Sequence, residues 1–104
     1  MLNVTFIVGI ATTPFIPLDK DYYTIKVESE EENGKTTTNT FLVPNKIVSQ
    51  IDRSGVSYIQ SHLLAVTGHI ENITGGENSV EITTAFADKI IILDLPSGQK
   101  QYAV

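Results

Sequence analysis

The stretch that decides the fold covers residues 36–54 and reads TTTNTFLVPNKIVSQIDRS. Its first part, residues 36–43, is rich in β-branched and aromatic residues, a composition typical of a strand. A short helix is predicted directly after it, because three apolar residues recur at helical spacing: Ile47, Val48 and Ile51. Asn45 is the predicted N-cap of this helix, and Gly55 marks its predicted end. The stretch therefore predicts a strand that leads straight into a short helix.

Two further strands are predicted before this stretch. Residues 2–10 alternate with period two, and one parity holds Leu2, Val4, Phe6, Val8 and Ile10. Residues 22–29 form the next predicted strand, with inward positions at Tyr23, Ile25 and Val27. The pair Asn33-Gly34 follows and tolerates positive φ at both turn positions, which indicates a β-hairpin. Residues 12–20, which contain two prolines, are predicted to be a connection.

Two long strands are predicted after the helix, at residues 62–73 and 80–93. The first has an alternating apolar parity at Leu64, Val66, Gly68 and Ile70. The order of elements is therefore three strands, a short helix and two strands. This order is the layout of an all-β, five-stranded OB-fold barrel of antiparallel strands with one short helix after the third strand. A small SH3-like barrel is the competing fold, but it has shorter strands and no helix at this point.

The length and composition fit one domain. The chain has 104 residues, of which 41% are hydrophobic and none is cysteine. This composition excludes a disulfide scaffold and a metal site built on thiolates. We expect the OB-fold domain to cover residues 1–93 and a C-terminal tail to cover residues 94–104. No run approaches the ~20 consecutive apolar residues of a membrane-spanning helix, so no membrane partner is expected.

The net charge of −5 is unevenly distributed along the chain. Residues 19–32 contain six acidic side chains and two lysines, which gives this segment a net charge of −4. The run Glu30–Glu32 lies at the tip of the predicted hairpin. Such a charge opposes indiscriminate binding to polyanions, because long-range repulsion keeps them away.

The sequence offers little that could support catalysis or metal binding. Its two histidines, His62 and His69, are seven residues apart and would face opposite sides of a regular strand. Glu30, Glu31 and Glu32 are consecutive, whereas calcium loops need alternating ligands. The sequence has no nucleophile elbow and no phosphate-binding glycine loop. We therefore expect a non-enzymatic protein with no metal and no other cofactor.

Binding to an extended polymer is the function that remains for such a barrel. OB folds bind their ligands across the second and third strands. Single-strand binders combine cations that follow the phosphates with aromatic rings that stack on bases. The outward positions of this face predict a site for single-stranded DNA at Lys20, Tyr22, Lys26, Thr38, Thr40 and Lys46. The other aromatic residues on strands are predicted to lie in the core: Phe6, Phe41 and Phe86.

Several motifs resemble the bacterial single-stranded DNA-binding protein (SSB) family. Asn3–Gly9 is similar to the first strand of that family, an apolar run that ends in Val-Gly, and Pro14 falls where the family often has Asp-Pro. Phe41–Lys46 resembles the end of the third strand, where an apolar run leads into a helix through a lysine. The resemblance implies that Lys46 lies beside the DNA path.

The resemblance continues through the last two strands. Leu64–Ile70 is similar to the apolar-x-apolar-x-Gly-x-apolar pattern of the fourth strand, and Ala87–Leu93 resembles the Ala-Asp-x-Val-x-x-Leu of the fifth. Two departures stand out, because Thr38 and Pro44 occupy positions where the family stacks bases on aromatic rings. The best match is to a small, tail-less variant of the kind found in minimal-genome, wall-less bacteria.

The resemblance implies sequence-independent binding of single-stranded DNA in replication, recombination or repair. It also implies a cytoplasmic, nucleoid-associated homo-oligomer, either a dimer or a tetramer. The alternative hypothesis is an OB-fold protein-interaction module with little affinity for nucleic acid, whose acidic hairpin docks on a basic partner. RNA and oligosaccharides are further ligand classes that OB folds bind.

Overall fold

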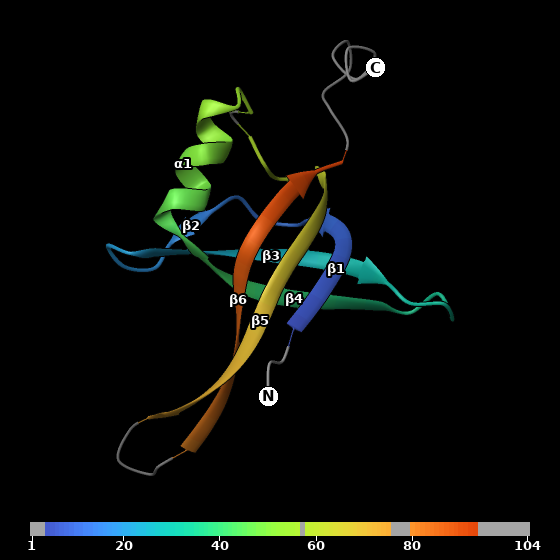
Figure 1. Cartoon of the computed structure of the whole chain (residues 1–104). Coiled ribbons are helices and arrows are strands. Elements are labelled where there is room, and N and C mark those ends of the chain that lie inside the picture. Colours follow the sequence, from blue (N-terminus) through green and yellow to red (C-terminus); the bar gives the residue numbers. More distant parts are fainter. Residues whose placement is uncertain (1–3, 57, 76–79, 94–104) are drawn as a thin grey trace.

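A computed structural model of the chain describes residues 4–56, 58–75 and 80–93, and the side-chain burial of residues 4–56, 58–71 and 84–93. The elements follow one another along the chain as in Figure 1: β1 (Val4–Ala11), β2 (Ile16–Pro17), β3 (Tyr22–Glu30), β4 (Thr36–Pro44), α1 (Asn45–Arg53), β5 (Leu63–Gly75) and β6 (Val80–Ile92). The expected turn at residues 76–79 and the expected tail at residues 94–104 lie outside the described residues.

The strands close into a barrel. The sheet order is β1-β5-β6-β4-β3-β2, and β1 also pairs with β3, so five long strands form a closed ring. The predicted all-β, five-stranded barrel with one helix is confirmed. Two details of the prediction are wrong. The pairing of β4 with β6 is parallel, and the helix follows the fourth strand rather than the third.

The additional strand is β2, which lies inside the segment predicted to be a connection. Its two residues pair with β3, Ile16 opposite Thr24 and Pro17 opposite Tyr23. Proline lacks the hydrogen that a ladder needs, which restricts such a strand to the edge of a sheet. The prolines therefore shorten this strand but do not abolish it.

The core lies inside the barrel and under α1. Its largest fully buried side chains are Phe41, Ile25, Leu64, Val27, Val43 and Val66, which come from three strands. The helix adds the three residues predicted from its spacing, Ile47, Val48 and Ile51. The core prediction for Phe41 is therefore confirmed. No helix among the described residues has the length and apolar character that crossing a membrane requires.

The apolar parity of β1 faces outward, and this is a correction to the prediction for Phe6. Phe6 is 66% exposed and Val4 is 64% exposed, whereas Gly9 and Ala11 face the interior. The reason is the close crossing of β1 over β3. A Cβ on Gly9 would lie 2.2 Å from the carbonyl oxygen of Glu28, so only a residue without a side chain fits there.

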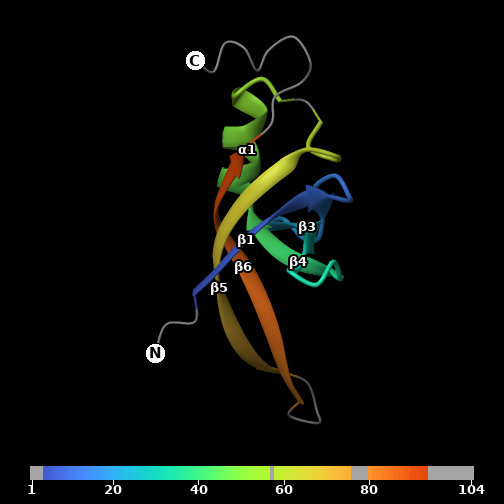
Figure 2. The same cartoon turned by 90° about the vertical axis from the view of Figure 1, so that its right-hand side faces the viewer.

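Two hairpins extend from the barrel. The predicted turn between β3 and β4 is present, with positive φ at Gly34 (84°) but not at Asn33, and it carries the exposed glutamates Glu30–Glu32. Figures 1 and 2 both show β5 and β6 as a long ribbon that continues past the other strands, at the end of the barrel away from α1. The predicted site lies on the barrel face between these two hairpins.

Candidate nucleic-acid interface

One row of outward side chains crosses four strands of the barrel. Thr24 on β3 pairs with Leu42 on β4, Leu42 pairs with Phe86 on β6, and Phe86 pairs with His69 on β5. All four side chains are half-buried, whereas their neighbours along the chain include the core residues Ile25, Phe41, Val43, Ala87 and Gly68. Direct partners in a sheet share a face. The row therefore forms a continuous outer surface from β3 to β5.

Aromatic rings gather along this row. The rings of Tyr22 and Phe86 are 5.9 Å apart at an interplanar angle of 66°, an edge-to-face contact. The rings of Phe86 and His69 are 5.2 Å apart at an angle of 10°, so they stack. Both arrangements are favourable for aromatic pairs. Tyr22 therefore belongs to a cluster of three rings on the outer face, which we call the aromatic cluster: Tyr22, Phe86 and His69.

Two members of the aromatic cluster were not predicted from the sequence to lie in the site. Phe86 was assigned to the core, but it is half-buried on the outer face, and His69 was given no role. Next to Phe86, the interior side of β6 holds Ala85 and Ala87, which pack on the core. A Cβ on Gly68 would lie 2.1 Å from the carbonyl oxygen of Phe86. The alternation of small and large residues in Ala85-Phe86-Ala87 is the signal that indicates the outward ring.

The structure separates the predicted site residues on β3 and β4 into two environments. Lys26 is exposed and pairs with Thr40, so these two lie together on the same face as Tyr22. Thr38 instead pairs with Glu28, closer to the acidic hairpin tip. The cationic part of this face is therefore the half that contains Tyr22 and Lys26.

Lys20 and Lys46 lie at the end of the barrel where β3 begins and β4 ends. The side-chain amide of Asn45 donates a hydrogen bond to the carbonyl oxygen of Lys20, and the backbone N–H of Asn45 donates to Asp21 at 3.0 Å. Asn45 is thus the first residue of α1 and not its N-cap, which is Pro44. Because Lys46 follows Asn45, both lysines lie at the same end of the face, and both are exposed.

The turn that carries Lys20 is held in place by Asp19. Its Oδ1 accepts hydrogen bonds from the backbone N–H groups of Asp21 at 2.8 Å and Tyr22 at 2.9 Å. This side-chain turn is typical of aspartate, which satisfies backbone donors two and three residues ahead. The same bonds fix the start of β3 and hence the position of Tyr22.

Carboxylates border the other end of the aromatic cluster. The Nδ1 of His69 lies 2.9 Å from both oxygens of Asp88, and its Nε2 lies 3.9 Å from Oε2 of Glu71. Lys89, the residue after Asp88, pairs with Thr67 and is exposed. In the described part of the chain, no group of three His, Asp or Glu side chains has an arrangement that could hold a metal ion.

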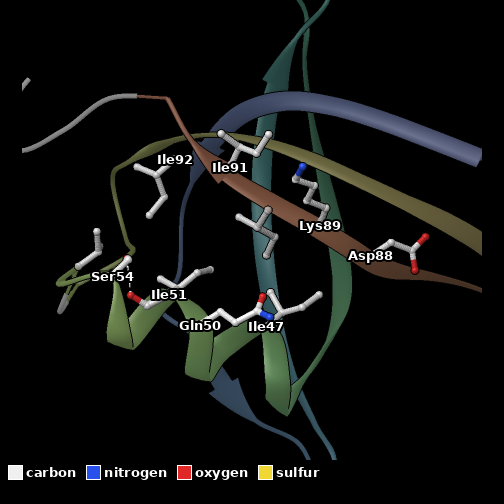
Figure 3. Close-up of a pocket in the computed structure, with 10 residues that line it drawn as sticks. Ile47, Gln50, Ile51, Ser54, Asp88, Lys89, Ile91 and Ile92 are labelled. Carbon is white, nitrogen blue, oxygen red and sulfur yellow. Dashed lines mark hydrogen bonds between the residues drawn. The ribbon is translucent and has the colours of Figure 1, made fainter. Parts of the chain in front are cut away.

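A separate groove lies between α1 and β6 (Figure 3). Its volume is about 430 Å³, and its walls include Ile47 and Ile51 of the helix. Figure 3 shows Asp88 and Lys89 near one end and Ser54 near the other. The described residues that line the groove include no aromatic ring. It therefore lacks the stacking surface that the outer face provides.

The chain is similar to known proteins at the level of structure. No protein-family model matches the chain, and no curated protein matches it. The mitochondrial single-stranded DNA-binding protein Rim1 of S. cerevisiae superposes with a TM-score of 0.70 at 19% identity, covering 90% of this chain and 97% of Rim1.

Two bacterial structures are also similar. The N-terminal domain of PriB from Thermoanaerobacter tencongensis, described as dimeric, gives a TM-score of 0.65 at 16% identity over 89% of this chain and 98% of that domain. A small single-stranded DNA-binding protein from Mycoplasma pneumoniae gives 0.55 at 14% identity over 91% of this chain and 97% of that one. This chain is thus SSB-like in structure, and it shares the OB-fold barrel with these proteins.

Proposed function

We propose that this protein binds single-stranded DNA, independently of sequence and without catalysis, on the outer face that carries the aromatic cluster. The observation that carries the proposal is the contact of Tyr22 with Phe86 on the outer face of an OB barrel, the same face of β3 that carries the cation Lys26. Aromatic rings stack on bases of any sequence, and cations hold the phosphates. The names of the structural neighbours, which include single-stranded DNA-binding proteins, support the same ligand.

The proposal extends to the setting in which the protein acts. We propose a role on DNA that is unpaired during replication, recombination or repair, in the cytoplasm and in association with the nucleoid. The OB-fold domain, residues 1–93, would supply the whole binding face. The net charge of −5 makes a single protomer a weak polyanion binder, so several linked copies would bind more tightly than one.

The first experiment measures fluorescence anisotropy of a labelled oligo-dT at two or more salt concentrations, beside a duplex of the same length. We expect binding to oligo-dT and little binding to the duplex. Binding to neither at low salt would contradict the proposal. That result would favour the docking module, which can be checked by replacing Glu30, Glu31 and Glu32 with glutamine and measuring capture of a basic peptide.

The salt dependence should report the lysines of the face. If Lys20, Lys26 and Lys46 each neutralise one phosphate, the slope of log K against log salt is about −2 per protomer, because each contact on a single strand contributes about 0.7. The triple variant with glutamine at these positions should reduce the slope to near zero. Lys35→Gln, at the exposed acidic hairpin, is the matched control and should leave it unchanged. If the slope did not change in the triple variant, the phosphates would have to contact cations other than these three lysines.

The exposed stripe of β1 supports self-association into a dimer or tetramer. Val4, Phe6, Val8 and Ile10 are between 43% and 66% exposed on one side of the strand. In the described residues, β1 pairs with β5 along Val4–Ile10 but with β3 only at Ile10 and Ala11. One edge of most of β1 therefore has unpaired backbone groups beside an apolar surface, a combination that favours pairing with a second copy.

Phe6→Asp should dissociate this assembly. In a two-fold interface the change occurs twice, and each buried Phe side chain contributes about 1.5–3 kcal/mol. The two losses together amount to about 3–6 kcal/mol, so we expect the association constant to fall at least about 100-fold. Size-exclusion chromatography with light scattering should show a shift toward the 11.4 kDa monomer. Tyr58→Asp, at a similarly exposed ring (59%) outside β1, should not shift the mass; equal effects of both would argue against a β1 interface.

A further inference from the structure

We propose that His69 makes the DNA-binding face proton-sensitive: protonation of its ring strengthens binding of single-stranded DNA. This inference rests on the proposed function and concerns the regulation of the same face. It starts from the position of His69 within the aromatic cluster, where its ring stacks on Phe86 at 5.2 Å and Phe86 contacts Tyr22. A change of charge on His69 therefore occurs next to the rings on which bases would stack.

The hydrogen bond to Asp88 determines which ring nitrogen of His69 is free to gain a proton. Nδ1 lies 2.9 Å from both carboxylate oxygens of Asp88, and an ionised carboxylate only accepts hydrogen bonds. The hydrogen of the neutral ring is therefore on Nδ1, which leaves a lone pair on Nε2. The neutral ring cannot donate a hydrogen bond from Nε2 to a phosphate. Protonation places a hydrogen on Nε2 and turns this atom into a charged donor.

The charged groups around His69 give the direction of the effect. Asp88 and Lys89 come from β6, and Glu71 comes from β5 itself, with its Oε2 3.9 Å from Nε2. The neighbouring strand β1 presents Val4 opposite His69 and has no titratable side chain in Val4–Ala11. With a neutral ring, the two negative charges of Asp88 and Glu71 outweigh the one positive charge of Lys89 beside an approaching phosphate. Protonation of the ring offsets one of these two negative charges.

Exposure keeps this site within reach of a ligand and of solvent. The side chain of His69 is 32% exposed, and those of Asp88 and Glu71 are 52% and 57% exposed. Histidine side chains change charge between about pH 5 and 8, whereas carboxylates ordinarily titrate near pH 4. Phosphates favour the charged ring, so by linkage DNA binding should take up protons in the histidine range. Affinity should therefore rise as the pH falls from 7.5 to 5.5.

The experiment measures the affinity of the full chain for labelled oligo-dT at pH 7.5, 6.5 and 5.5, at constant ionic strength. We expect the wild-type protein to bind about three- to tenfold more tightly at pH 5.5 than at pH 7.5, the range for one charge close to a phosphate in a solvated site. His69→Gln should remove this rise. His62→Gln is the matched control, since the chain has only these two histidines, and it should keep the rise.

A second variant and a second measurement keep the proposal testable if His69→Gln does not fold. Asp88→Asn keeps the ring but removes one of the negative charges beside it, so it should bind oligo-dT more tightly than the wild type at pH 7.5. Calorimetry in two buffers of different ionisation enthalpy should show proton uptake on DNA binding that is lost in His69→Gln. Binding that does not change with pH, or a rise that persists in His69→Gln, overturns this inference and leaves the proposed function intact. No binding at any pH overturns both.

Discussion

Replacing Tyr22 and Phe86 together by alanine should weaken binding to oligo-dT about 30-fold or more. Their rings are 5.9 Å apart on the outer face of the barrel, and in the proposed binding mode each supports a base. Base–aromatic stacking contributes about 1–3 kcal/mol per base, so the loss of two stacking surfaces is worth about 2–6 kcal/mol. Fluorescence anisotropy at low salt measures the loss directly, and the salt slope should not change, because the lysines remain.

The matched control for this variant is Tyr58→Ala. Tyr58 belongs to the segment of chain that connects α1 to β5, outside the aromatic cluster, and it is 59% exposed. Its replacement by alanine should leave the affinity for oligo-dT unchanged. Circular dichroism melts should show that the double variant is folded at the assay temperature. If the folded double variant binds like the wild type, bases do not stack on this face, and the single-stranded DNA would have to follow another path.

Local signals in the sequence predicted most of the barrel. Asn33-Gly34 indicated the hairpin because few residue pairs adopt positive φ without strain, and the hairpin forms, although only Gly34 of the two has positive φ (84°). The inward positions of β3 were correct, since Ile25 and Val27 are fully buried. The helix was predicted from three apolar residues at helical spacing, and all three are buried. In each case the residues that determine the structure are close together in the sequence.

The errors in the candidate site have a non-local cause. Period-two alternation in β1 shows that one face is apolar, but it does not show whether that face is inside the barrel. The decision depends on where β1 crosses β3, about 20 residues later, and Gly9 and Ala11 are the residues small enough for the crossing. Phe86 was assigned to the core for the same reason, because the narrow interior at Gly68 is invisible in a single strand. Large apolar residues were expected to fill the interior sides of β1 and β6, but the close backbone approaches at Gly9 and Gly68 leave no room for a side chain at these two points.

Gly9→Ala tests this account of the closure, and we expect it to reduce the free energy of unfolding by about 3 kcal/mol, at the upper end of the usual cost of overpacking. The new Cβ would lie 2.2 Å from the carbonyl oxygen of Glu28 and 3.0 Å from Cγ1 of Val27. The first contact is with backbone, which cannot rotate away as a side chain can. The strands β1 and β3 would have to separate where they pair through Ile10 and Ala11. Urea unfolding followed by circular dichroism gives the loss of stability.

Gly34→Ala separates this steric effect from the general cost of replacing a glycine. Gly34 lies in an open turn with no atom within 4 Å of the added Cβ, and its φ of 84° alone should cost about 1 kcal/mol. If Gly9→Ala cost no more than Gly34→Ala, β1 would not cross β3 this closely. Its apolar parity would then be free to turn inward, and the exposed stripe that supports self-association would disappear with it. The larger loss at Gly9 is expected because closing the barrel and exposing Phe6 are consequences of the same crossing.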